Sequence, residues 1–98
     1  NSVTLGEKGL KRLEEMKSKY SIISDVRGLG LFFGIELTKN GKPAQKEAEE
    51  VLYHSLSNGL SYKVGGGCIL TLCPPMTITE GELNEAFDVI EAGIKEVS

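Results

Sequence analysis

The segment from Leu29 to Leu37 constrains the fold most, because a large apolar residue occupies every second position along it. The alternating apolar positions are Leu29, Leu31, Phe33, Ile35 and Leu37. A period of two places such residues on one face of a β-strand. The other face carries small or mixed residues, and its glycines, Gly30 and Gly34, would let another segment pack closely against the backbone. The sequence therefore predicts a strand that is buried on one face.

Helix signals flank this strand at both ends of the chain. Thr4-x-x-Glu7 and Thr79-x-x-Glu82 are both capping boxes, which typically begin helices. Between them, residues 43–57 have helical periodicity, with Pro43 suited to a first turn. Asn58-Gly59 would end that helix.

Two further strands are predicted after residue 59. Alternation over 60–64 indicates a short strand, and Gly65-Gly66-Gly67 turns the chain into a second strand, Cys68 to Cys73. Pro74-Pro75 ends it, because proline cannot donate to a ladder. With a strand beginning near Ile22, the order is α-β-β-α-β-β-α. The expected fold class is α/β (α+β), a two-layer sandwich in which a short, mostly antiparallel sheet of three to four strands packs against three helices.

Charge and hydropathy exclude two classes of partner. The formal net charge is −3, and the basic residues are interleaved with acids, which argues against a nucleic-acid surface. The longest apolar run, Leu29 to Ile35, is far too short to cross a bilayer, which takes about 20 residues. We therefore expect neither nucleic acid nor membrane as a partner.

The two cysteines, Cys68 and Cys73, cannot bond to each other if they lie in one extended strand. Their Cα atoms would then be roughly 16 Å apart, at ~3.3 Å per residue, whereas a disulfide needs less than about 7 Å. With one histidine in the chain, a metal site is not expected either. Two free thiols fit a reducing compartment, and we expect a cytoplasmic protein.

Several residues suggest chemistry but lack the pattern that it requires. Gly28-Leu29-Gly30 leads into a strand rather than a helix, unlike a dinucleotide-binding motif. The glycines at 65–67 could bind an anion, although a hairpin turn explains them as well. His54 has no Asp, Ser or Cys placed to orient it, which favours a surface role. Arg27 could clamp a carboxylate, or could form an internal ion pair with Asp25.

Two other candidates are a thiol and a lysine. Cys73 could be a nucleophile, but no base lies near it in sequence, and a buried cysteine is usually a small hydrophobe. Lys63 is the lysine closest to an apolar setting, yet nothing around it in sequence would depress its pKa for Schiff-base chemistry. No catalytic, cofactor-binding or metal-binding residue is therefore assigned in this chain.

Two motifs together resemble a known family. The run Ile23 to Leu37 (ISDVRGLGLFFGIEL) and the later run Ile69 to Ile78 (ILTLCPPMTI), followed by Thr79-x-x-Glu82-Leu83, resemble the C-terminal small domain of class III aminotransferases. The resemblance covers essentially the whole chain, which begins at Asn1 rather than Met. It implies a fold-type I, pyridoxal-phosphate-dependent enzyme in which residues 1–98 are one domain of a larger chain.

The resemblance also implies where the chemistry lies. In such enzymes the cofactor lysine, and the aspartate that pairs with the pyridine nitrogen, belong to the large domain, so the 98 residues alone should be inactive. The small domain forms a substrate-facing wall, and the parent is usually a homodimer. The expected activity is transfer of an amino group from an amine or ω-amino acid to a keto acid.

One position of the resemblance is informative about the substrate. Many members that bind an α-carboxylate have an arginine four residues before the second proline of the Pro-Pro pair, where this chain has Thr71. A hydroxyl cannot replace a bidentate guanidinium, so the expected donor lacks an α-carboxylate or has it held by the large domain. Alternatively, Thr71 is a plain strand residue and another arginine binds the carboxylate.

Two readings from other classes remain open. The chain could be a stand-alone α/β ligand-binding or regulatory module. It could also be an interaction domain whose glycine-containing strand face meets a partner helix, which predicts an exposed apolar patch.

Overall fold

The computed structural model describes residues 2–66, 68–75 and 77–98. Three helices and five strands follow one another as α1 (Ser2–Lys19), β1 (Ile23–Leu29), β2 (Phe32–Lys39), β3 (Lys42–Pro43), α2 (Gln45–Ser57), β4 (Lys63–Gly65), β5 (Ile69–Leu72) and α3 (Glu80–Val97). The predicted order is confirmed, with one additional strand of two residues, β3. Because β3 pairs only with β2, the main sheet keeps the four strands that the sequence indicates.

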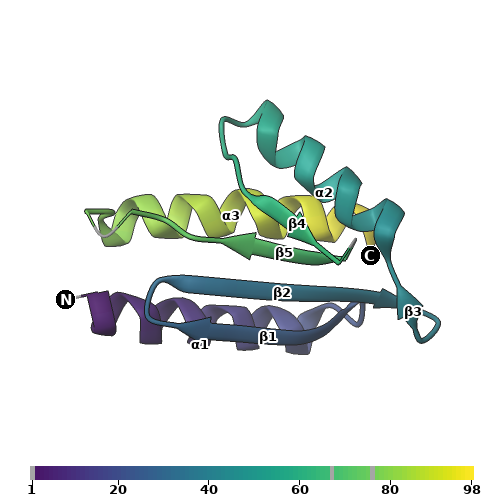
Figure 1. Ribbon diagram of the computed structural model, residues 1–98, viewed down its shortest axis with the longest axis horizontal. Coiled ribbons are helices and arrows are strands. Elements are labelled where there is room, and N and C mark those ends of the chain that lie inside the picture. The colour runs from purple at the N-terminus through teal and green to yellow at the C-terminus, as the bar shows by residue number, and fades with distance from the viewer. Residues whose placement is uncertain (1, 67, 76) are drawn as a thin grey trace.

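The main sheet is antiparallel throughout and has the order β1-β2-β5-β4. Helices α1 and α3 lie side by side behind it and run in the same direction, and α2 packs beside α3 at the β4 end (Figure 1). The expected two-layer sandwich is therefore correct. We call the side of the sheet toward α1 and α3 the inner face, and the opposite side the open face.

The inner face carries the core. Phe33, Ile35 and Leu37 of β2 are each at most 2% exposed, as the alternation predicts. The ring of Phe33 meets Phe87 of α3 edge to face, with centroids 5.2 Å apart and planes at 79°. Such a pair contributes roughly 0.5–1.5 kcal/mol beyond the area it buries. Leu70 of β5, 2% exposed, extends this apolar layer to the neighbouring strand.

The prediction of one strand from Leu29 to Leu37 is wrong at its beginning. Leu29 ends β1, Gly30 has a positive φ of 58°, and β2 begins at Phe32, so the segment turns back on itself as a hairpin. Leu29 is therefore 83% exposed instead of buried. The expectation that the missing side chain of Gly30 permits close packing is wrong, because a Cβ there would meet nothing within 4 Å; the glycine that lets α1 approach this turn is Gly6, whose Cβ would overlap the carbonyl oxygen of Gly30.

Helix boundaries follow the capping signals at one end of the chain only. Thr79 caps α3, with its Oγ1 accepting from the Glu82 amide at 3.1 Å and the Glu82 carboxylate accepting from the Thr79 amide at 2.9 Å. Thr4 does not cap α1, because that helix already includes Ser2. Pro43 belongs to β3, and α2 begins at Gln45. The predicted end of α2 is correct: Asn58 is its C-cap and Gly59 has φ 80°.

Candidate functional site: the open face of the sheet

The open face displays the residues that alternate with the core residues of each strand. Thr71 of β5 lies between Leu70 and Leu72, which both point inward and are buried, so its side chain points to the open face. Lys63 precedes Val64, which packs against the core, and it shares the open face. The charged outward residues of β1 are Asp25 and Arg27, on the opposite edge of the sheet.

Strand register brings Lys63 and Thr71 together. Lys63 pairs directly with Thr71, one step after Val64 pairs with Leu70. Side chains at directly opposed positions have Cβ atoms roughly 4.5–5.5 Å apart. The structure therefore places the predicted substrate residue beside a cation that the sequence analysis had not connected with it.

These two residues line a hollow of about 460 Å³, together with Phe32, Ser61, Tyr62 and Cys73. Phe32 is 52% exposed and forms an apolar wall. The Tyr62 hydroxyl bonds Ser55 Oγ of α2 at 3.0 Å. Burial raises the pKa of Tyr62, and this hydrogen bond offsets part of the increase. Tyr62 thus shapes the hollow while its hydroxyl is engaged on α2, and the side-chain hydroxyls left to the hollow are those of Ser61 and Thr71.

The Asp25–Arg27 ion pair occupies the other edge of the open face. Arg27 Nε lies 3.0 Å from Asp25 Oδ2, and the bond from Arg27 lowers the pKa of Asp25. The Arg27 side chain is 74% exposed, so this is a surface pair and not the internal pair that we had considered. A carboxylate clamp at Arg27 stays a prediction. Gly34, the register partner of both Arg27 and Thr71, is buried between Arg27 and Ile69.

The cysteines lie in different surroundings, and both are free thiols. Cys68 is buried, and this burial, followed by the nearby Glu36 carboxylate, raises the pKa of its thiol. Cys73 is exposed at the edge of the hollow, so the expectation that it is a small buried hydrophobe is wrong. The two thiols are thus separated as the strand geometry predicts.

We expected His54 to be a surface residue, but its side chain is half-buried and contacts α3. It lies in the last turn of α2, where its Nδ1 is 3.7 Å from Glu96 Oε2 of α3. A Cβ on Gly93 would be 3.1 Å from its ring, so the imidazole packs against the backbone of α3. This contact helps to hold α2 on α3 and lies on the side away from the open face.

The glycine motifs form turns, as the structural alternatives suggested. Gly65 ends β4 and its carbonyl accepts from the Cys68 amide at 3.2 Å, which closes the β4–β5 hairpin. Gly66 has φ 57° within this turn, and Gly67 lies outside the described residues. Gly28 and Gly30 belong to the β1–β2 hairpin, with no helix N-terminus after them.

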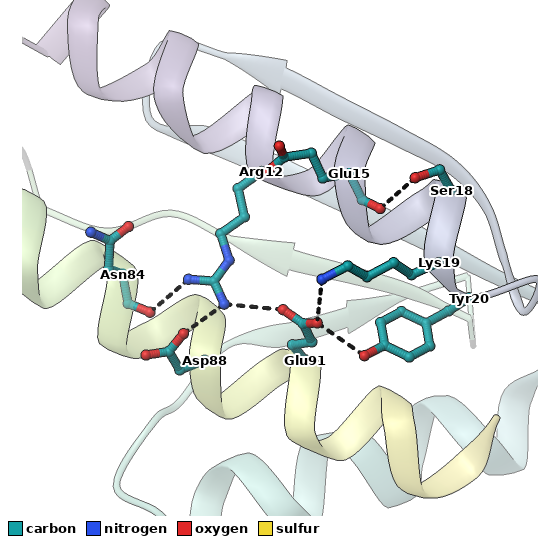
Figure 2. Close-up of polar contacts among 8 residues, drawn as sticks. All are labelled: Arg12, Glu15, Ser18, Lys19, Tyr20, Asn84, Asp88 and Glu91. Carbon is teal, nitrogen blue, oxygen red and sulfur yellow. Dashed lines mark hydrogen bonds and ion pairs between the residues drawn. The ribbon is translucent and has the colours of Figure 1, made fainter.

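A cluster of charged groups on the helices has a structural role (Figure 2). Arg12 of α1 extends to α3, where Nη2 lies 2.6 Å from Asp88 Oδ1 and 3.1 Å from Glu91 Oε1. The other oxygen of Glu91 accepts from the Tyr20 hydroxyl at 2.9 Å and lies 3.7 Å from Lys19 Nζ. Burial opposes the charge on Glu91, but these donors outweigh it and lower its pKa. Because these groups pair with one another, the cluster joins two helices.

The described residues include no lysine suited to hold an aldehyde cofactor such as pyridoxal phosphate. That role requires a lysine that is desolvated or otherwise has a depressed pKa. Every lysine of the chain is exposed, including Lys63. Among residues 2–66, 68–75 and 77–98, no group of three or more His, Cys, Asp or Glu side chains is arranged to hold a metal ion, and no helix could cross a bilayer. What the open face offers is an ammonium group and two hydroxyls around the hollow, from Lys63, Ser61 and Thr71.

The Lys63–Thr71 pairing could have been found from the sequence. A hairpin that turns at the glycine triplet pairs residues equally distant from its centre, and Gly65 pairs with Ile69. Continuing outward by two residues gives Lys63 and Thr71. The sequence signal is the glycine turn, because taking it as the centre of a hairpin gives the pairing of Lys63 with Thr71.

Comparison with known proteins identifies the family. Residues 1–94 match the family described as aminotransferase class-III. The (R)-1-hydroxy-2-aminoethylphosphonate ammonia-lyase of Vibrio splendidus is 42% identical over 90 residues, which cover 89% of this chain and 19% of that protein. The leucine/methionine racemase of Thermococcus litoralis is 36% identical over 96 residues, covering 95% and 22%.

A solved structure agrees with these sequence relatives. The crystal structure of acetylornithine aminotransferase from Elizabethkingia anophelis has a TM-score of 0.85 and 33% identity, covering 97% of this chain and 23% of that one. The chain thus spans about a fifth of the length of these relatives. With both the sequence match and the fold in agreement, this chain belongs to the class-III aminotransferase family.

Proposed function

We propose that residues 1–98 form the C-terminal small domain of a pyridoxal-phosphate-dependent enzyme and supply one wall of its substrate site. The observation that carries this proposal is the family match over residues 1–94 combined with coverage of only about a fifth of each relative. The remaining length of such proteins is enough for a large domain that holds the cofactor. The open face, with its hollow at Thr71, is the surface that this domain would turn toward it.

The chemistry then belongs to the whole enzyme. The cofactor, when bound, stabilises negative charge at the carbon that bears the amino group. The residues of this chain would bind and orient the remainder of the substrate, and the isolated 98 residues would be inactive. We propose transfer of an amino group from an amine or ω-amino acid to a keto acid, in a cytoplasmic homodimer. The acetylornithine aminotransferase with the same fold supports the reaction type.

Thr71 is the proposed substrate-binding residue. It is half-buried in β5 and lines the hollow, which supports a role in contact with a ligand. Its hydroxyl offers a single neutral donor where a guanidinium would offer two parallel charged ones. A donor without an α-carboxylate therefore suits this wall better than an α-amino acid.

The test uses the full-length enzyme that contains this chain. Its activity should be assayed with a keto acid acceptor and either a simple amine without a carboxylate or ornithine as donor. Thr71→Arg should shift the preference toward ornithine by roughly tenfold or more, since charge-assisted hydrogen bonds contribute about 1.5–3 kcal/mol. Thr71→Ser keeps the hydroxyl and serves as the control. An unchanged preference in Thr71→Arg would remove Thr71 from the site.

A second candidate reaction is elimination of ammonia. The relative that is 42% identical is named as an ammonia-lyase, whereas the acetylornithine aminotransferase is 33% identical. The two reactions differ in what they need, because transamination requires a keto acid acceptor and elimination does not. Release of free ammonia by the full-length enzyme without any keto acid would favour elimination over transamination.

A further inference from the structure

We propose that Lys63 binds an anionic group of the substrate, specifically a tetrahedral phosphate or phosphonate, in the hollow that it shares with Thr71. This inference rests on the proposed function, because the substrate would enter the hollow from the large-domain side. It adds a residue and a ligand chemistry that the family membership alone does not supply.

The position of Lys63 is fixed by backbone register. It pairs directly with Thr71, and both residues line the 460 Å³ hollow. Opposed side chains on one face of a sheet are neighbours. The flexible four-carbon stem of lysine lets its ammonium extend over the neighbouring strand. The positive charge absent from position 71 is therefore available from one strand away.

Lys63 also differs from the other basic groups in its surroundings. Lys8, Lys19 and Lys39 are each paired with a carboxylate of the chain, and the other unpaired lysines of the described residues, Lys11, Lys17, Lys42, Lys46 and Lys95, lie outside the hollow. Within the described residues, Lys63 has no carboxylate within 4.0 Å, and it is the only charged residue that lines the hollow. Arg27, the other cation on the open face, is already bonded to Asp25. The charge at Lys63 is thus free to meet an external anion.

The donor set favours a tetrahedral anion over a carboxylate. The planar fork of arginine matches carboxylate and phosphate alike, whereas lysine binds as a point charge and sets no planar geometry, so the other donors of the hollow decide between the two anions. The hydroxyls of Thr71 and Ser61 add single donors around the hollow. Donors that approach separately match the three oxygens of a phosphonate, which point in different directions. Phe32 offers an apolar wall for a short carbon chain.

The decisive measurement is binding of inorganic phosphate and of 2-aminoethylphosphonate to the full-length holoenzyme by titration calorimetry. Lys63→Met keeps the apolar stem and removes the charge, and should raise both dissociation constants roughly 10- to 100-fold, as expected for loss of a charged hydrogen bond. Lys63→Arg should restore most of the affinity. Lys42→Met, at an exposed lysine of β3 outside the hollow, is the matched control.

The outcomes separate this inference from the proposed function. Equal phosphate affinity in wild type and Lys63→Met overturns the role of Lys63, even if the enzyme transaminates amines. Equal losses in Lys63→Met and Lys42→Met would also overturn it, because they indicate a general effect of surface charge. If the affinities change as expected but no amine is turned over, the anion site stands and the proposed reaction fails.

Discussion

The two sides of the sheet differ in how their charged groups are paired and how tightly their glycines are packed. On the helix side, the charges of Arg12 and Glu91 are paired with one another across α1 and α3. On the open side, Arg27 is paired with Asp25, but Lys63 has no carboxylate partner among the described residues and faces a hollow. Charges that hold a fold together are satisfied within it, whereas charges that bind a ligand are left available. This difference supports the hollow, rather than the cluster between the helices, as the candidate site.

The largest change in the free energy of unfolding should come from a methyl group added at a glycine on the helix side of the sheet. A Cβ on Gly9 of α1 would lie 2.6 Å from the ring of Phe33, which is 1% exposed and cannot move freely. Overpacking costs about 1–3 kcal/mol, and alanine recovers up to about 1 kcal/mol of helix propensity. Gly9→Ala should therefore destabilise the 98-residue chain by about 1–2 kcal/mol in urea unfolding.

The matched change on the open side is Gly34→Ala. Its Cβ would meet only Arg27 and Ile69, both at 3.9 Å, which is ordinary contact distance. We expect the free energy of unfolding to change by less than about 0.5 kcal/mol. A loss at Gly34 as large as that at Gly9 would show that the two faces do not differ in packing as described.

A smaller effect is expected from removing the cation that joins α1 to α3. Arg12→Met leaves Asp88 and Glu91 without their shared partner, while methionine keeps some of the packing against Phe87. The Arg12 side chain is 24% exposed and Asp88 68%, so solvent screens much of the loss, and we expect about 0.5–1 kcal/mol. Lys8→Met, which breaks the exposed Lys8–Glu80 pair, should cost less than about 0.5 kcal/mol. Equal costs would mean that the cluster is no stronger than a surface pair.

The smallest effect concerns pH. The pKa of Glu91 is lowered in the fold, so its carboxylate contributes stability above the unfolded value of about 4.3, and this contribution is lost as the pH falls through the lower folded value. Between pH 6 and pH 3, the free energy of unfolding measured in urea should fall less steeply for Glu91→Gln than for the unaltered chain. In the Arg12→Met variant, Glu91→Gln should change the pH dependence of the unfolding free energy less, because Arg12, the principal hydrogen-bond donor to Glu91, is already absent.

Features that depend on neighbouring residues were predicted more successfully from the sequence than features that depend on distant contacts. The α3 cap at Thr79 and the buried face of β2 were predictable, because each depends on residues within a few positions of one another. The position of Leu29 was wrong because alternation continues through a tight turn without interruption, and only the left-handed Gly30 marks the reversal. Thr4 failed as a cap because residues before it already extend the helix.

The candidate site could be predicted only in part. Thr71 came from a resemblance at one position, whereas its neighbour Lys63 required the pairing of two strands. The contact between the His54 ring and Gly93 likewise depends on how α2 packs on α3, and no local sequence pattern indicates that packing. A residue type indicates what a side chain can do, but its partner is set by contacts that are distant along the chain.

The length of the β4–β5 turn determines which side chains line the hollow. Side chains along a strand alternate between faces, so whether Lys63 and Thr71 share a face depends on the turn between them keeping its length. A single-residue insertion there would disrupt the pairing or turn Lys63 toward the helices, without any change to Lys63 itself. Within this fold, the length of a glycine turn would therefore select between an open face with a positive charge beside Thr71 and one without it.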